Sequence, residues 1–313
     1  MGPQSGHLPR ATSPARATRH WWWKSVEGYL FISPWLLGFV VFALGPFVAS
    51  FLLSFAEWNL VKPPVWVGLT HYRAMFSADP KWTKSLYNTA YFTAFHVPSL
   101  LIVAMLAALL LNRPLPGIGV FRTIFYLPSV TGGVAMAILW VWVFSYRFGL
   151  LNQALALIGV QGPNWLGSTA WAKPAFVIMS LWTFGFNMVI YLAALQGVPR
   201  ELYEAAEMDG AGHWHKFAKV TMPMVSPSVF FTMIMTIIGS FQIFTAAFIM
   251  TGGGPADATL FYSLHLYRHA FQWLNLGYAS AMAWFLFIVI LVLTLIQLRL
   301  SGRWVYYAGE PPR

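Results

Sequence analysis

The chain has 313 residues, of which 58% are hydrophobic and 9% are Asp, Glu, Lys or Arg, and its formal net charge is +10 at pH 7. A soluble domain carries about 25% charged residues, so this composition excludes an ordinary soluble enzyme and indicates an integral membrane protein. The absence of cysteine excludes disulfides, thiolate zinc sites and cysteine nucleophiles.

The first predicted element is a cytoplasmic tail over residues 1–28. Its first part, to about residue 20, is rich in Pro, Ser, Thr, Ala and Arg, which is typical of disorder. Trp21, Trp22 and Trp23 follow and predict an aromatic anchor at the membrane interface. The next apolar run is too long for a cleaved signal peptide.

Six apolar segments follow, each long enough to cross the membrane, since a spanning helix needs roughly 20 apolar residues. They cover residues 29–55, 86–111, 121–144, 174–196, 224–250 and 278–298. We therefore expect an all-α polytopic protein with one membrane domain over residues 29–300. A short cytoplasmic tail, 301–313, completes the chain. Prolines inside several spans predict kinked helices and a lined cavity.

The distribution of Lys and Arg predicts the orientation of these spans. With the N-terminus in the cytoplasm, 12 of the 19 Lys and Arg fall in cytoplasmic segments and 7 in outer segments. The positive-inside rule then places both termini in the cytoplasm. Because these charges are dispersed between apolar segments, membrane topology explains them better than nucleic-acid binding does.

The interiors of the spans are almost free of ionisable side chains. No Asp, Glu, Lys or Arg lies well inside a span, and we interpret the one histidine there, His96, as a packed residue rather than a proton relay. Neutral polar and aromatic side chains alternate in the fourth and fifth spans. Each polar group can simply bond a neighbouring helix. Together they also suit a neutral, polyhydroxylated ligand.

No catalytic or nucleotide-binding motif is present. The run Gly252–Pro255 lacks the Lys-Ser/Thr that follows the glycines of a phosphate loop. His265 and His269 are spaced for one helix face, but no third ligand is evident on that face. We therefore expect no metal site and assign the pair to an outer interfacial surface.

One loop between spans, residues 199–223, has an unusual charge. Four of the nine acidic residues of the chain lie between positions 201 and 209. Pro199 suits the first turn of a helix, and Gly210 or Gly212 can take the left-handed conformation that ends one. Leu202, Ala205, Ala206 and Asp209 would share a helix face, and Trp214, Phe217 and Ala218 would share one side of a second short helix.

The small residues of the first face allow another surface to approach closely, and the surrounding charge can set the register. We therefore interpret the loop as a docking element for a cytoplasmic partner. A solvated helical hairpin remains the plain alternative. A DNA-reading helix-turn-helix is disfavoured because four carboxylates would repel phosphate.

The run "EAAEMDGAGHWHKFAKVTMP" resembles the EAA loop of ABC importer permeases. The matching positions are Glu204, Ala205, Ala206, Gly210, Met222 and Pro223. The segments "LQGVPRELYEAAEMDGAG" and "MTGGGPADATLFYSLHLYRHAF" are similar to the carbohydrate-uptake branch of that family, of the maltose-permease or glycerol-phosphate-permease type. The resemblance covers nearly the whole chain from Tyr29 onward.

The resemblance implies a type I importer permease fold in a prokaryotic inner membrane. Such a subunit pairs with a second permease, usually a different chain, above two copies of a cytoplasmic ATPase that bind ATP and Mg. An extracytoplasmic binding protein delivers the sugar. This chain would bind no cofactor and hydrolyse no ATP.

The resemblance also implies roles for individual residues. Glu204 would contact the ATPase, Gly210 would set the turn of the loop, and Asp209 would support the structure of the loop or its docking. Sugar contacts would come from the fourth and fifth spans. The candidates there are Trp182, Asn187, Thr236, Ser240 and Gln242.

Three other functions stay open. An ABC permease for glycerol-3-phosphate or another small solute would share the loop, although the "TGGGP" segment and the uncharged spans argue against a charged substrate. An ATP-independent channel or scaffold would need no ATPase. A membrane-embedded enzyme would need a catalytic constellation that the sequence does not contain.

Overall fold

A computed structural model describes residues 2, 19–114 and 116–306, and it divides the chain into two compact units, Met1–Leu52 and Leu53–Arg313. Most of the expected N-terminal tail and residues 307–313 of the expected C-terminal tail lie outside the described residues, as do the side chains of the tryptophan cluster. Each unit is considered by itself.

The first unit is a single apolar helical segment. Helix α1 (Arg19–Phe39) continues through a π-helical turn (Val40–Leu44) into α2 (Gly45–Leu53). The stretch Gly28–Leu53 is long and apolar enough to cross a membrane, and none of its most apolar window is buried. A helix that is apolar all round needs lipid or protein against it.

The second unit begins with a two-residue antiparallel pair, β1 (Ala56–Glu57) and β2 (Val65–Trp66), and is otherwise helical where it is described. Its helices are α3 (Thr70–Ser77), α4 (Pro80–Leu111), α5 (Ile118–Val130), α6 (Gly133–Val143), α7 (Leu150–Leu157), α8 (Ala172–Leu181), α9 (Gly185–Gln196), α10 (Arg200–Met208), α11 (His213–Lys216), the π-turn η2 (Phe217–Thr221), α12 (Met222–Phe241), α13 (Thr245–Met250), α14 (Tyr262–Tyr267), the π-turn η3 (Arg268–Gln272) and α15 (Leu276–Ser301).

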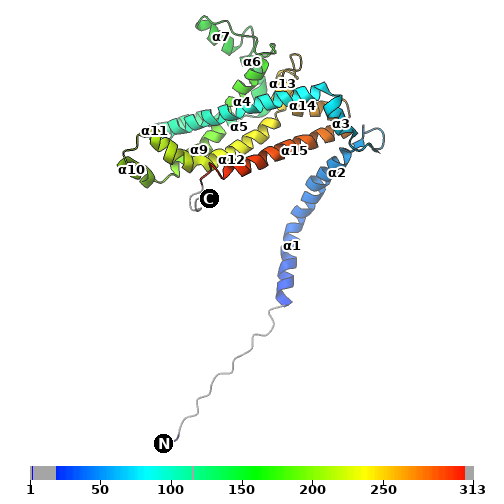
Figure 1. Ribbon diagram of the computed structural model, residues 1–313, viewed down its shortest axis with the longest axis horizontal. Coiled ribbons are helices and arrows are strands. Elements are labelled where there is room, and N and C mark those ends of the chain that lie inside the picture. Colours follow the sequence, from blue (N-terminus) through cyan, green and yellow to red (C-terminus); the bar gives the residue numbers. More distant parts are fainter. Residues whose placement is uncertain (1, 3–18, 115, 307–313) are drawn as a thin grey trace. The chain divides into compact units, whose positions relative to one another are not determined.

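Helix α4 is the centre of this unit. It packs against α8, α9 and α12, and α12 packs in turn against α15 (Figure 1). One buried cluster joins α4 to α9 through Ala104, Ala108, Met188 and Tyr191. The small side chains of α4 at this contact let the two helices approach closely, as is common in membrane bundles.

The number of spans depends on how two bent helix pairs are counted. Four helices are long and apolar enough to cross a membrane, and there are up to six spans if each bent pair among the described residues is one span. The expected span at 121–144 is not a straight helix, because α5 and α6 meet at an angle of 101°. Thr131 and Gly132 take extended backbone there, which ends α5 and starts α6 afresh.

The fourth and fifth expected spans are also interrupted. Helices α8 and α9 meet at 44° around Thr183, and the break between α12 and α13 falls at Gln242–Phe244. At a helix end, up to four backbone groups lose their helical partners. Residues at or beside all three breaks line one cavity of the unit.

Candidate functional site

The loop 199–223 folds as one short helix, α10, followed by the start of a long one, because α11 runs without a break through η2 into α12. The second short helix expected from the sequence is therefore the first part of that long helix. Pro199 is the N-cap of α10, with φ −58° and ψ 135°, and Glu201 lies in the first turn. Proline has no N–H to leave unsatisfied there, and the carboxylate faces the positive end of the helix dipole. The order of residues in the sequence thus accounts for where α10 begins.

Gly210 ends α10 in the left-handed conformation, with φ +76°. The N–H of Gly210 donates to the carbonyl of Glu207 at 2.9 Å, and that of Ala211 donates to the carbonyl of Ala206 at 2.9 Å. This pair of bonds is a Schellman motif, which needs a residue that tolerates positive φ. Gly212 has φ −69° and instead caps α11, so the left-handed turn belongs to Gly210.

Side-chain contacts hold α10 against the helical segment that follows it, α11 and η2. Lys216 on α11 donates to Glu207 on α10 at 2.6 Å, and this hydrogen bond lowers the pKa of the Glu207 carboxyl. The hydroxyls of Tyr203 and Thr221 lie 3.0 Å apart. The loop is therefore a defined structure rather than a loose linker.

The outer surface of the loop carries apolar side chains in the open. Met208 is 89% exposed, Trp214 is 77% exposed and Leu202 is 40% exposed. Apolar side chains of this size, exposed on a segment that also carries carboxylates, make the loop a candidate interaction surface. Sequence reasoning missed Met208, although its place between two acidic residues was a usable signal.

The residues matched to the EAA loop differ in how exposed they are. Glu204, Ala205 and Asp209 are exposed, whereas Ala206 is half-buried. Asp209 is the C-cap of α10. A cavity of 410 Å³ lies beneath this end of the loop, lined in part by Ala206, Asp209 and Gly210. Met222 and Pro223 are half-buried and begin α12.

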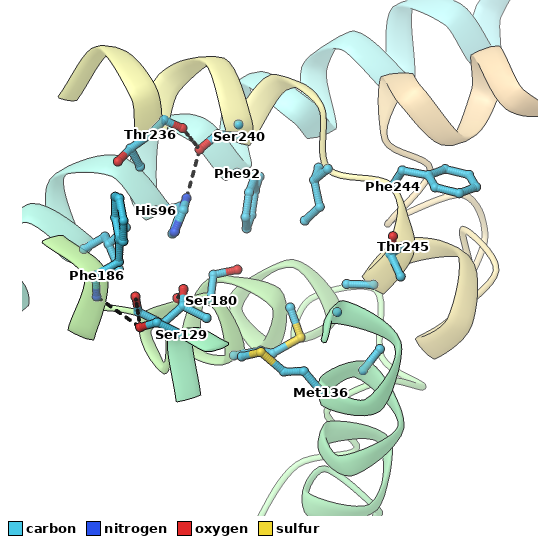
Figure 2. Close-up of a pocket in the computed structure, with 18 of the residues that line it drawn as sticks. Phe92, His96, Ser129, Met136, Ser180, Phe186, Thr236, Ser240, Phe244 and Thr245 are labelled. Carbon is cyan, nitrogen blue, oxygen red and sulfur yellow. Dashed lines mark hydrogen bonds between the residues drawn. The ribbon is translucent and has the colours of Figure 1, made fainter. Parts of the chain in front are cut away.

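A second candidate site is a cavity of 460 Å³ among the interrupted helices. Residues of α4, α5, α6, α8, α9, α12 and α13, with the breaks between them, line it (Figure 2). Its lining is mostly apolar, with hydroxyl, amide and imidazole groups set into it, and includes no Asp, Glu, Lys or Arg among the described residues. Such a cavity can take a neutral ligand that is partly apolar and partly hydrogen-bonding.

The cavity divides the five expected sugar-contact residues. Asn187, Thr236 and Ser240 line it. Trp182 and Gln242 are not among the lining residues; the former is 51% exposed and the latter is the exposed C-cap of α12. Both positions fall at helix breaks, as the C-caps of α8 and α12.

His96 is a polar residue of this cavity, and it is packed and hydrogen-bonded as the sequence predicted. It is 9% exposed, and its Nδ1 lies 2.9 Å from the hydroxyl of Ser240, whose proton goes to the carbonyl of Thr236 at 2.6 Å. Its other ring nitrogen, Nε2, has no hydrogen-bond partner among the described residues and faces the cavity (Figure 2). A buried polar atom without a partner is costly.

Two serines also contribute to the polar lining of the cavity. The hydroxyl of Ser129 accepts from the N–H of Phe186 at 3.0 Å and donates to the carbonyl of Thr183 at 3.3 Å, so it joins the end of α5 to the break before α9. Ser180 lies at the end of α8. Sequence reasoning missed both because only the fold brings these helix ends to one cavity.

Comparisons with known proteins identify the family and the fold of the chain. Residues 74–306 match the family described as the inner membrane component of binding-protein-dependent transport systems. The chain is 40% identical to a probable ABC transporter permease, YesP, of Bacillus subtilis (91% of this chain, 94% of the relative) and 36% identical to a lactose transport permease, LacF, of Rhizobium radiobacter (87% and 93%).

A solved structure shares the fold. A chain of a bacterial alginate ABC transporter, crystallised in complex with an alginate pentasaccharide-bound periplasmic protein, superposes with a TM-score of 0.78 at 23% identity, over 90% of this chain and 97% of that one. The described fold is thus that of an ABC importer permease. The chain belongs to the family of inner membrane components of binding-protein-dependent transport systems.

Proposed function

We propose that this chain is a permease subunit of an ATP-driven importer that moves a neutral sugar or oligosaccharide into the cytoplasm. An extracytoplasmic binding protein delivers the sugar, and two copies of a cytoplasmic ATPase drive the cycle through the loop 199–223. A second permease, a different chain, completes the pathway. The names of the relatives, a lactose permease among them, support the sugar assignment.

The exposed apolar surface of the loop is the observation that carries the ATPase coupling. Met208 and Trp214 stay in the open beside Glu204 and Asp209, on a loop braced by its own hydrogen bonds. A rigid element of this kind transmits motion, whereas a flexible linker does not. In the proposed cycle, closure of the ATPase dimer moves this element and with it α12, which follows it directly.

The neutral cavity favours a sugar over glycerol-3-phosphate. An anion in a low-dielectric site needs a fixed cation or a cluster of amides. The cavity offers instead the side chains of His96, Asn187 and Thr236, next to the rings of Phe92 and Phe186. Hydroxyl groups can bond the first set, and the apolar faces of a pyranose ring can lie on the second.

The packing of Trp304 and Tyr306 supports a position for this last described part of the chain on the same side of the membrane as the loop 199–223. The N–H of Tyr306 donates to Ser226 near the start of α12 at 2.9 Å, and Trp304 meets the ring of Phe230. The loop 199–223 directly precedes that start. With the excess of Lys and Arg in the same segments, we place loop and C-terminus in the cytoplasm.

Co-purification from the native membrane, followed by reconstitution, tests this function. We expect the tagged chain to bring an ABC ATPase and a second permease, and the reconstituted complex to take up sugar only with ATP and a loaded binding protein. A chain that is recovered alone, or that passes solute without ATP, would contradict the proposal and favour a channel or scaffold.

A further inference from the structure

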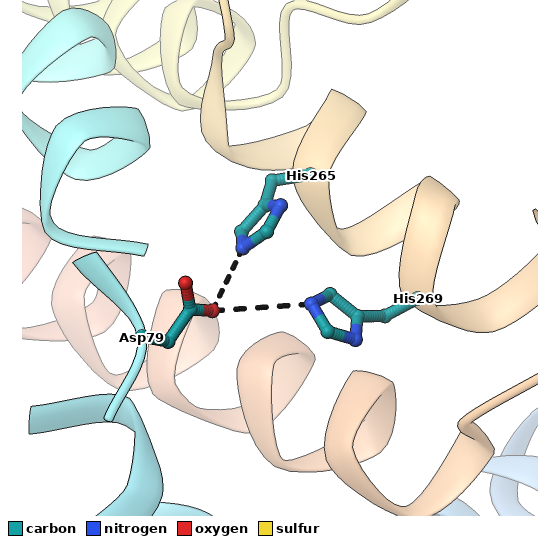
Figure 3. A group of neighbouring side chains, drawn as sticks. All are labelled: Asp79, His265 and His269. Atoms are coloured by element: carbon teal, nitrogen blue, oxygen red, sulfur yellow. Dashed lines mark hydrogen bonds and ion pairs between the residues drawn. The ribbon is translucent and has the colours of Figure 1, made fainter. Parts of the chain in front are cut away.

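We propose that Asp79, His265 and His269 form a zinc-binding site. It lies at the end of the second unit away from the loop 199–223 (Figure 1). The three ligand atoms lie within 4.8 Å of one another (Figure 3). The sequence shows the histidine pair but no third ligand near it. The fold supplies that ligand from the residue before α4.

The two histidines converge on one carboxylate oxygen. Nε2 of His265 lies 2.9 Å and Nε2 of His269 lies 3.9 Å from Oδ2 of Asp79. Zinc bonds of about 2.0–2.2 Å in a tetrahedral site put neighbouring ligand atoms roughly 3.3 Å apart. The two observed distances bracket that value, whereas the two imidazoles lie up to 4.8 Å apart. The imidazoles therefore have to approach each other by up to about 1.5 Å to complete the three-ligand set.

The carboxylate is already oriented by other groups. Its Oδ1 accepts from the N–H groups of Lys81 and Trp82, both at 3.0 Å, and its Oδ2 accepts from the hydroxyl of Tyr278 at 2.8 Å. Metal-binding carboxylates are held in this way by an outer layer of donors. A helix cap alone would explain the Oδ1 bonds, but it does not explain why a second imidazole faces Oδ2 beyond hydrogen-bond distance.

The nearby cations are engaged elsewhere. The ammonium of Lys81 lies 3.8 Å from the carboxylate of Asp257, and the guanidinium of Arg268 donates to the carbonyl of Gly252. A cavity of 390 Å³ adjoins the three side chains and offers room for a water as the fourth ligand. Two imidazoles, one carboxylate and a water are a donor set that zinc favours among the common divalent metals.

Zinc would join parts of the chain that are far apart in sequence. Asp79 precedes α4, His265 lies on α14, His269 on η3, and Tyr278 on α15. Metal bound there would fix the ends of these helices to one another. The proposal does not depend on sugar import, because none of the three ligands lines the membrane cavity.

Zinc binding by the full-length chain, purified with its accompanying subunits on a tag without histidine, tests the site. The variants are D79N, in which asparagine keeps the helix cap but loses the charge, and His269→Gln. The matched control is the double variant His213→Ala/His215→Ala, which removes two exposed histidines from the coupling loop.

We expect one zinc per wild-type chain by elemental analysis, and for Co²⁺ the intense visible absorption of a tetrahedral site. Both signals should disappear in D79N and His269→Gln and persist in the control. Zinc affinity should fall by more than about 100-fold, beyond the 10–100-fold that outer-layer changes cause. No zinc on the wild-type chain at micromolar free metal, or equal binding by wild type and D79N, would overturn the proposal.

Discussion

The loop 199–223 and the cavity among the interrupted helices differ in how the chain builds them. The loop is contiguous, exposed and charged, and its contacts, such as Lys216 with Glu207, are local. The cavity is neutral and assembled from segments far apart, such as those of His96 and Ser240. The loop is thus determined by a short run of sequence, whereas the cavity forms only when distant helices pack together. The two should respond differently to substitution.

Charge reversal in the loop should have the largest effect. We expect Glu204→Lys to weaken ATPase docking by roughly 2–5 kcal/mol, as loss of a paired interfacial charge does, and to abolish ATP-dependent uptake. Because Glu204 is exposed, the thermal unfolding temperature in detergent should not change. Glu57→Lys, an equally exposed reversal on β1, is the control. Normal ATPase recovery with Glu204→Lys would show that this residue does not dock.

A substitution behind the cavity should damage folding instead. A Cβ at Gly185 would overlap the carbonyl oxygen of Phe125, which is backbone of α5 and cannot move aside cheaply. We expect Gly185→Ala to destabilise the chain by about 1–3 kcal/mol, measured by thermal unfolding in detergent. Gly239→Ala, in the same cavity but with nothing within 4 Å, should be neutral. Equal melting of the two variants would contradict the close packing of α9 on α5.

Two glycines in the loop separate backbone strain from side-chain bulk. Neither would place a Cβ within 4 Å of a neighbour, but only Gly210 has a positive φ. We expect Gly210→Ala to cost the loop roughly 1–2 kcal/mol and to lower uptake, while Gly212→Ala has little effect. Protease sensitivity of the loop and sugar uptake measure both. A larger loss of uptake with Gly212→Ala than with Gly210→Ala would contradict the assignment of the turn to Gly210.

The smallest effect should come from single polar groups of the cavity. We expect Asn187→Ala to weaken sugar recognition by about 0.5–1.5 kcal/mol, the worth of one hydrogen bond to a neutral group. The concentration of loaded binding protein needed for half-maximal uptake should rise accordingly. Gln242→Ala, outside the cavity, is the control. A stronger defect with Gln242→Ala would show that Gln242, rather than Asn187, contacts the sugar.

The same contrast decides what the sequence could predict. Pro199 and Gly210 bound α10 through chemistry within a few residues, so the sequence alone is enough to place the loop. The apolar runs predicted the helical segments for the same reason. Pro128 predicted a kink in the span at 121–144, but neither the proline nor the hydropathy predicted a full break at Thr131 and Gly132 or its angle of 101°.

The long-range contacts escaped prediction altogether. His96 meets Ser240 across 144 positions, and Asp79 meets His265 across 186. Nothing near either histidine in the sequence identifies its partner. A single sequence therefore predicts helix α10 well, the cavity through three of its eight polar lining residues, and the histidine–aspartate cluster only as an isolated pair of histidines.

Cross-linking from the loop is the most direct test of the central claim that residues 199–223 dock on an ATPase. The chain has no cysteine, so Met208→Cys, at a position that is 89% exposed, introduces a single thiol for a photoactivatable cross-linker. Val61→Cys, at a position 82% exposed outside the loop, is the control. We predict a cross-link from residue 208 to an ATP-binding subunit, altered by ATP, and none from residue 61. An ATPase that cross-links to residue 61, or to neither, would contradict the account.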